Sequence, residues 1–223
     1  NNYMKKVLFT CLGLMTLITA KAQQIEFGPT IGYRFNNIVD RKAETKRAVI
    51  GDALWETEYG FQAVYNFRKP GNEMNYRLTA FYQNQKRGSK SERFSNERFE
   101  IDTNGFGLLF GIAREVSPKW ILTLNLGLGS NSMDTKDYYK GDQSQMIAFD
   151  KLNADLEPKT NEINFLYQIG VERVLIQNKL LVFVDFHGDA GISKMNESVG
   201  SYGNQGFGFG AGLRYLVDLS KKD

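Results

Sequence analysis

Cysteine, histidine and proline are scarce in this chain, and their scarcity excludes some kinds of fold and of functional site. The one cysteine is Cys11, within the first 22 residues, and the one histidine is His187. The rest of the chain can therefore form neither a disulfide framework nor a thiolate site for a metal or for nucleophilic catalysis. Proline is limited to 4 residues, whereas glycine reaches 22 and aromatic residues 13% of the chain. This composition is unusual for a soluble domain.

Long hydrophobic runs are also missing after the first 22 residues. Lys5 and Lys6 precede an apolar stretch over residues 7–19, and a small-x-small sequence, Ala20-Lys21-Ala22, follows it. This order is typical of a cleaved export signal, and the stretch is shorter than the about 20 residues that a membrane-spanning helix needs. We expect residues 1–22 to be a signal peptide that is removed.

The expected cleavage leaves residues 23–223 as a single domain, with residues 1–3 upstream of a start at Met4. The signal carries three of the 28 basic residues and no acidic one, so the remaining chain has as many basic residues as its 25 acidic ones. A neutral chain gives no indication of nucleic-acid binding. Since no further stretch could form a membrane helix, a membrane location would require a closed barrel, whose strands satisfy every backbone hydrogen bond.

The end of the chain alternates without error between two kinds of residue. From Gly206 to Leu219, one set of alternate positions is apolar, whereas the other is mostly glycine, with Arg214 and Asp218. A β-strand turns alternate residues to opposite faces, so this segment predicts a strand with one continuous apolar face. It is longer than the about 5–6 residues of a typical soluble strand, as the wall of a membrane barrel requires.

Seven further segments show the same period of two, which predicts an all-β chain of eight antiparallel strands. Several reach about ten residues, the length that a tilted membrane strand needs. The predicted strands are Ile25–Phe35, Trp55–Phe67, Tyr76–Gln85, Ile101–Arg114, Trp120–Ser130, Ile163–Val174, Leu180–Ile192 and Gly206–Leu219.

The connections between these segments alternate in length. Long loops would therefore collect at one end of a barrel, and short turns with both chain ends at the other. In outer-membrane barrels the short turns face the periplasm and the long loops face outward. The short connections are Arg68–Asn75, Glu115–Lys119 and Leu175–Lys179, and the long ones are Asn36–Leu54, Lys86–Glu100, Asn131–Glu162 and Ser193–Gln205.

A soluble barrel, apolar inside and polar outside, is the alternative architecture. An eight-stranded interior has little room for Phe, Tyr, Trp and Leu side chains from every strand. Glycine and charged residues inside, with bulky residues outside, fit the available volume better. We therefore predict an up-and-down transmembrane barrel with long extracellular loops and short periplasmic turns.

This pattern resembles the small outer-membrane barrels of the OmpA membrane domain, OmpX and PorT-like type. The resemblance rests on the signal, the eight strands and the alternating connections, and the Ala-Lys-Ala-Gln-Gln sequence resembles signals of Bacteroidetes-type bacteria. It implies a monomer in the bacterial outer membrane with a non-enzymatic structural or surface-interaction role. The alternatives are a lipid-modifying enzyme of the lipid-A deacylase or acyltransferase type, a narrow pore, and a PorT-like secretion component. The chain departs from the family after Leu219, where Ser220 to Asp223 follow instead of a terminal aromatic residue.

Charged residues occupy the strand face that is predicted to line the lumen. Unpaired charges are costly to bury, so we expect a network that plugs the lumen. The first and last strands adjoin, which would bring Arg214 near Glu26 and Asp218. By resemblance to OmpA, re-pairing of these charges could instead open a gate for water or ions. The predicted network consists of Glu26, Arg34, Arg77, Glu172, Asp185, His187, Arg214 and Asp218.

Asp185, His187 and Asp189 project from one face of a predicted strand. Ligands at two-residue spacing along one strand reach a single ion poorly, and a second histidine is lacking, so we expect no metal and no cofactor. His187 beside Ser193 or a carboxylate could form a catalytic pair, but a lipid substrate would then have to reach a lumen-facing histidine. We predict no catalytic residue.

The third long loop is the best candidate for contact with a protein partner outside the cell or in the periplasm. It carries Tyr138 and Tyr139, and Phe149 and Leu152 have the spacing of one helix face. A lid over the lumen, a partner-binding knob and a surface turn are the alternatives. Outer-membrane lipid and lipopolysaccharide are the expected surroundings of the barrel. For the basic residues of loop Lys86–Glu100, a solvated loop is favoured over contact with lipopolysaccharide.

Overall fold

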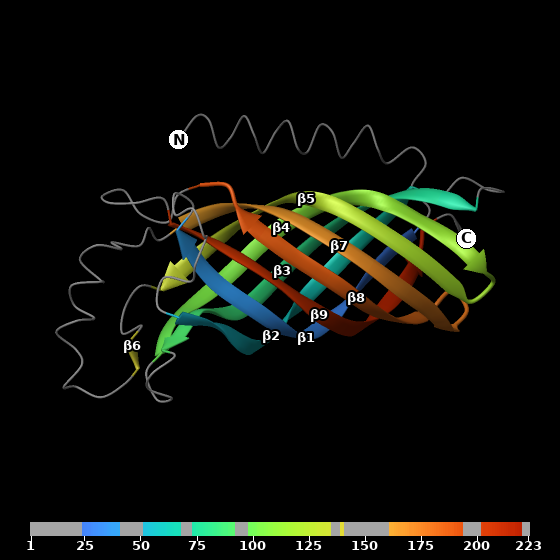
Figure 1. The fold of residues 1–223 in the computed structure, drawn as a ribbon. Coiled ribbons are helices and arrows are strands. Elements are labelled where there is room, and N and C mark those ends of the chain that lie inside the picture. Colours follow the sequence, from blue (N-terminus) through green and yellow to red (C-terminus); the bar gives the residue numbers. More distant parts are fainter. Residues whose placement is uncertain are drawn as a thin grey trace.

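The computed structural model describes residues 24–40, 51–67, 73–91, 98–134, 139–140, 161–193 and 202–219. These ranges form nine strands (Figure 1), and none of their residues belongs to a helix that could cross a membrane. The strands are β1 (Gln24–Asp40), β2 (Gly51–Phe67), β3 (Met74–Ser91), β4 (Arg98–Ser117), β5 (Trp120–Asp134), β6 (Tyr139–Lys140), β7 (Asn161–Ile176), β8 (Leu180–Gly191) and β9 (Tyr202–Asp218).

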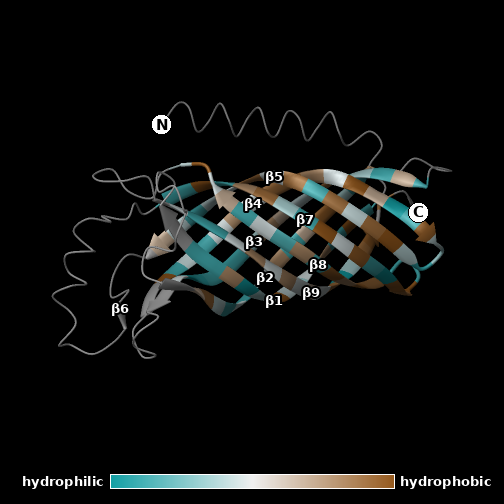
Figure 2. Cartoon of the chain, viewed as in Figure 1, coloured by the Kyte–Doolittle hydropathy of each residue, from teal (hydrophilic) through white to brown (hydrophobic). Residues whose placement is uncertain are grey.

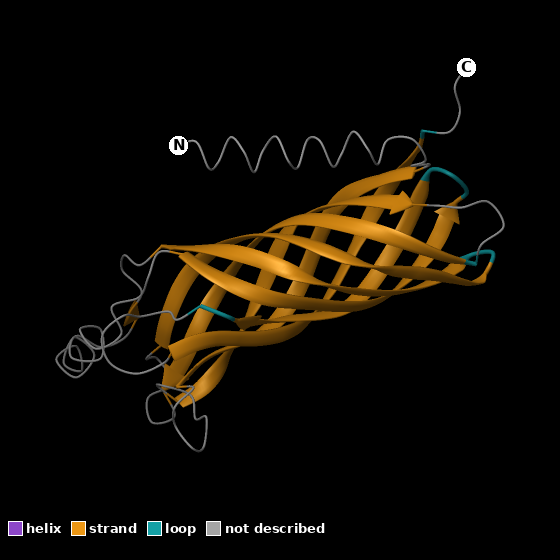
Figure 3. Cartoon of the chain, turned by 90° about the horizontal axis from the view of Figure 1, so that it is seen from above, coloured by secondary structure: helices purple, strands orange, loops and turns teal. Residues whose placement is uncertain are grey.

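Eight of these strands form a closed antiparallel barrel, seen from two sides in Figures 1 and 3. Hydrogen-bonded neighbours follow the order β3, β2, β1, β9, β8, β7, β5, β4, and a pairing of β3 with β4 closes the ring. The short β6 pairs with Arg98 and Phe99 at the start of β4. The prediction of an eight-stranded antiparallel barrel is confirmed.

The first and last strands, β1 and β9, lie side by side. Their register runs from Gln24 opposite Asp218 to Asp40 opposite Tyr202. A Cβ atom at Gly28 would lie 1.8 Å from a backbone oxygen of β9. Glycine is therefore required for the two strands to approach at this point of the barrel seam.

The strands extend further at the loop end than their apolar pattern predicts. β3 continues to Ser91 and β4 begins at Arg98, so most of the predicted loop Lys86–Glu100 is strand and that prediction is wrong. Similarly, β1 continues to Asp40 and β2 begins at Gly51. On β3 both faces are polar beyond the apolar belt, so the alternation disappears while the hydrogen-bonded ladder continues.

Short turns close the opposite end of the barrel. Pro118 and Lys119 join β4 to β5, and Gln177 to Lys179 join β7 to β8. Asn178 in the second turn has a positive φ of 58°, which asparagine tolerates better than most residues. Both turns lie within the predicted short connections.

An apolar belt covers the outside of the barrel wall, and Figure 2 shows hydrophobic residues along it and hydrophilic residues toward the loop end. Leu122 and Leu124 on β5 are 46% and 44% exposed, whereas Thr123 between them is 6% exposed. On β9 the belt runs from Phe207 to Val217, roughly 25 Å along the barrel axis at about 3.3 Å per residue and a tilt of about 40°. The alternative of an apolar interior with a polar exterior is therefore wrong.

Two aromatic rings, those of Phe81 and Phe183, lie inside the barrel beside charged side chains. A Cβ atom at Gly107 or Gly212, on the adjacent strand in each case, would lie 2.6 Å from one of these rings. Glycines on neighbouring strands thus make room for aromatic rings inside a narrow barrel.

Candidate functional site

Two glutamates and two arginines form a ring of ion pairs toward the turn end of the lumen. Arg77 Nη1 lies 2.6 Å from Glu172 Oε1, and Arg77 Nη2 lies 3.8 Å from Glu26 Oε2. Arg214 contacts the same two carboxylates: its Nη1 lies 3.1 Å from Glu26 Oε2, and its Nη2 donates to Glu172 Oε1. Positive and negative groups alternate, so this turn-end quartet is electrically balanced.

The turn-end quartet draws its members from four strands, β1, β3, β7 and β9. All four side chains are at most 5% exposed. Asn66 donates to Glu26 Oε1 at 2.5 Å, and the ring of Phe183 lies 4.6 Å from Arg214 Cζ, a contact that stabilises a cation. The quartet therefore crosses the lumen from opposite walls.

His187 lies between two carboxylates in the middle of the lumen. Its Nδ1 is 2.5 Å from Asp185 Oδ1, and its Nε2 contacts Glu58 Oε1. Gln83 donates to the other oxygen of Glu58, and Gln168 donates to Asp185 Oδ2 at 2.8 Å. Both ring nitrogens therefore face carboxylate oxygens, so a histidine that carries a proton on each nitrogen would form an ion pair with each carboxylate.

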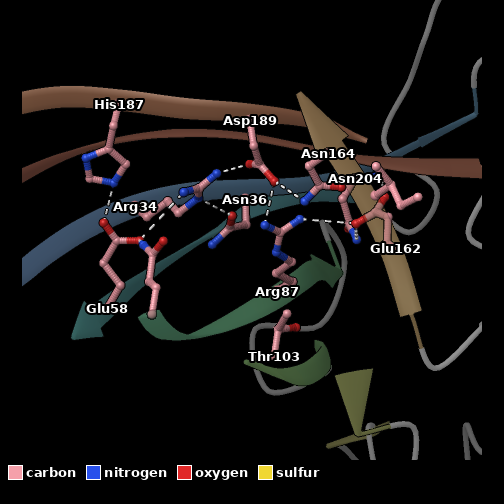
Figure 4. Close-up of polar contacts among 12 residues, drawn as sticks. Arg34, Asn36, Glu58, Arg87, Thr103, Glu162, Asn164, His187, Asp189 and Asn204 are labelled. Atoms are coloured by element: carbon pink, nitrogen blue, oxygen red, sulfur yellow. Dashed lines mark hydrogen bonds and ion pairs between the residues drawn. The ribbon is translucent and has the colours of Figure 1, made fainter. Parts of the chain in front are cut away.

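Arginines and carboxylates meet again toward the loop end, as Figure 4 shows. Asp189 accepts from Arg34 and also from Arg87, whose Nη2 lies 2.5 Å from Asp189 Oδ2. Arg87 Nη1 lies 3.4 Å from Glu162 Oε2. Arg34 Nη1 lies 3.7 Å from Glu58 Oε2, which links this loop-end cluster to the histidine group.

Three asparagines complete the loop-end cluster (Figure 4). Asn164 donates to Asp189 Oδ2 at 2.7 Å, and Asn204 donates to Glu162 Oε2 at 2.9 Å. Asn36 accepts from Arg34 Nε at 2.8 Å. The cluster therefore ties together five strands, β1, β3, β7, β8 and β9.

Four members of the loop-end cluster fall in predicted loops, so the sequence analysis missed them. They are Asn36, Arg87, Glu162 and Asn204. Each lies an even number of residues from a side chain of its strand that points inward, outside the apolar part of the strand. Arg87, for example, lies ten residues after the inward Arg77. Continuing the alternation of inward and outward positions into the polar segments would have identified these four residues.

Small cavities lie between these charged groups. One of about 50 Å³ lies beside the histidine group and the ring of Phe81, and one of about 10 Å³ lies between the turn-end quartet and Asp185. A water molecule needs roughly 10–15 Å³ of such space. Cavities of this size have room for isolated waters. A wider recess of about 260 Å³ lies at the turn end, and Glu26 and Glu172 form part of its lining.

Ser193, the catalytic partner considered for His187, lies far from it. Ser193 is six residues away, roughly 20 Å along an extended strand, and its Oγ accepts a hydrogen bond from the Ile163 backbone N–H at 2.8 Å. Asp189 belongs to the loop-end cluster and not to the histidine group. Among the described residues, no group of three or more histidine, cysteine or acidic side chains could hold a metal ion.

The predicted partner-contact residues lie largely outside the described part of the chain. Tyr138, Phe149 and Leu152 are not among the described residues, and Tyr139 is described through its backbone pairing in β6. The backbone of Asp218 pairs with that of Gln24, and its side chain is outside the description. The roles expected for these residues stay predictions.

Comparisons of the sequence with known proteins give no relative. No protein-family model matches the chain. A search of curated proteins also finds no match.

Comparisons of the structure find small barrels of low sequence identity. OprG, an outer-membrane protein of Pseudomonas aeruginosa, is 12% identical over 88% of this chain and 97% of its own, with a TM-score of 0.49. The N-terminal β-barrel domain of OprF from the same organism is 10% identical over 88% and 98%, with a TM-score of 0.47. Ail of Yersinia pestis, in complex with the heparin analogue sucrose octasulfate, is 14% identical over 85% and 98%, with a TM-score of 0.41. Likeness at this level assigns no function to the chain.

Proposed function

We propose that this protein spans the bacterial outer membrane as a monomeric, non-enzymatic barrel with a sealed lumen and a structural or surface-interaction role. The observation that carries the proposal is the distribution of polarity, which is the reverse of that in a soluble protein, with apolar side chains outside and charged side chains inside. Ile31 and Tyr59 on the outside are each 60% exposed, whereas Arg77 and Glu162 inside are each 1% exposed. Contact with lipid stabilises such a wall, and the closed barrel satisfies the backbone hydrogen bonds that lipid cannot.

The ion pairs of the lumen support a sealed barrel over a conducting one. Each arginine of the turn-end quartet contacts both carboxylates, and Asp189 in the loop-end cluster accepts from two arginines. Displacing one of these side chains would leave buried charges without partners, at a cost of several kcal/mol per ion. The two groups therefore act as seals in series, with the small cavities between them.

The orientation follows from the connections between strands. Short turns and both ends of the described chain lie at one end of the barrel, and short turns of membrane barrels face the periplasm. The long connections, with Tyr138 and Tyr139 among them, then face outward and provide the surface for partner contact. Export by a cleaved signal over residues 1–22 fits this location.

Two measurements on the purified protein test the proposal. The folded barrel should migrate differently in SDS gels before and after boiling, and in planar bilayers it should show no steady conductance. Protein that stays soluble without detergent and shows no heat-dependent shift contradicts the membrane barrel. A steady conductance contradicts the seals. Lipid-A mass spectra should be identical in cells with and without the protein, and an altered acyl pattern would favour a lipid-modifying enzyme.

A further inference from the structure

One sector of the outer wall is hollowed, whereas another is filled by aromatic rings. On β2, β1, β9 and β8, the rings of Trp55, Phe35, Phe207 and Phe186 follow one another with centroid separations of 5.2, 4.8 and 5.9 Å. Between β4 and β5 the surface instead contains a groove of about 540 Å³. The groove and this row of aromatic rings therefore lie on different sectors of the wall.

The groove has the size and polarity of a site for hydrocarbon chains. Its volume falls within the roughly 300–1,000 Å³ of small-molecule sites. The large apolar side chains that face outward along it are 46–57% exposed, apart from the less exposed Leu78. They are Leu78, Phe106, Leu108, Phe110, Leu126, Leu128 and Ile163.

A shelf of uncharged polar side chains borders the groove on its loop side. Asn104 lies two residues from Phe106 on the same face of β4, and its Oδ1 accepts from Tyr82 Oη and from Asn84 Nδ2, both at 2.8 Å. Ser132, opposite Asn104 on β5, is exposed. Within the described part of the chain, no hydrogen bond engages Asn104 Nδ2 or Asn84 Oδ1. The shelf therefore holds one donor and one acceptor in place for a ligand.

We infer that this sector binds a glycolipid of the lipid-A class, with an acyl chain in the groove and the saccharide headgroup on the shelf. The inference rests on the proposed membrane barrel, in which the loop end faces the outer leaflet. Carboxamide and hydroxyl groups match the hydroxyl and amide groups of a sugar. Lys86 and Asp102, the next outward pair on β3 and β4, carry opposite charges, so the surroundings of the shelf offer no excess of positive charge to a headgroup that is recognised through its charge alone.

Native mass spectrometry of the full, folded chain tests this site with a mixture of lipid A and phosphatidylglycerol. We expect lipid A to be retained about fivefold to tenfold more, the effect of one to two net hydrogen bonds. The double variant Asn84→Ala/Asn104→Ala should retain both lipids equally. Gln205→Ala is the matched control, since Gln205 is exposed on β9, which lies three strands from β3 in the ring. Equal retention of the two lipids by the wild type, or equal losses in both variants, overturns the inference.

A second pair of variants tests the groove. Leu108→Trp fills it and should lower lipid-A retention, whereas Leu213→Trp on β9 should not, although the two leucines are 46% and 45% exposed. Equal effects of the two tryptophans contradict a site on β4 and β5. The heat-dependent gel shift of each variant reports the barrel separately. Normal shifts without lipid preference would refute the lipid site and leave the membrane barrel standing.

Discussion

Replacing Glu172 by glutamine removes one negative charge from the turn-end quartet with little change of size. Arg77 and Arg214 both contact Glu172 Oε1, and after the change Glu26 alone would balance two buried guanidiniums, with Arg77 Nη2 3.8 Å from it. Removing one partner of a buried ion pair costs about 3–5 kcal/mol. We therefore expect Glu172→Gln to lower the free energy of unfolding by about 3–5 kcal/mol, measured by urea titration in lipid vesicles.

A charge-balanced double variant controls for the loss of packing. Arg77→Met with Glu172→Gln removes one charge of each sign and leaves Arg214 Nη1 and Glu26 Oε2 3.1 Å apart. Replacing a whole buried pair is often close to neutral, so the double variant should be more stable than Glu172→Gln alone. A loss below about 1 kcal/mol in the single variant, the range of an exposed pair, refutes the reasoning. So does a double variant that is less stable than the single one.

Two further predictions concern the histidine group and the barrel seam. His187→Gln leaves one amide donor for the two carboxylates that His187 contacts. Urea titration should therefore show a free energy of unfolding that is lower by about 1–3 kcal/mol. Adding Glu58→Gln should recover part of this loss, and no recovery would contradict the contact of His187 with Glu58. Gly28→Ala places a Cβ atom 1.8 Å from a backbone oxygen of β9 and should abolish the SDS-resistant form, whereas Gly105→Ala should keep it, because its nearest neighbour at 2.6 Å is the movable side chain of Asn131. Equal gel behaviour of the two alanine variants would contradict the close approach of β1 and β9.

The number and order of strands could be predicted because the apolar belt imposes strict alternation. Within it, outward positions are apolar and inward ones are small or polar, as in the run Leu122, Thr123, Leu124. Beyond Tyr82 on β3 the outward Asn84 and the inward Gln85 are both polar. The period of two is then invisible, although β3 continues to Ser91.

The sequence indicates which side chains point into the lumen, but it does not indicate which of them meet across it. Arg77 and Glu172 are 95 residues apart and lie on strands that are not neighbours in the ring. Whether they meet depends on their heights in the barrel, which the stagger of every intervening strand pair sets. The residues of a single strand give no information about the combined stagger of the intervening strand pairs. The contact of Arg87 with Asp189 could not be predicted for the same reason. In addition, Arg87 lies in a segment that was predicted to be a loop.

The depth dependence of a charge on the outer wall tests the membrane barrel most directly. Leu124 and Leu128 both face outward on β5, the first near the middle of the apolar belt and the second near its loop-side edge. In lipid vesicles, Leu124→Arg should lower the free energy of unfolding by about 2–4 kcal/mol and Leu128→Arg by about 0–1 kcal/mol. Small and equal losses at the two positions would mean that the wall faces water, and would contradict the account.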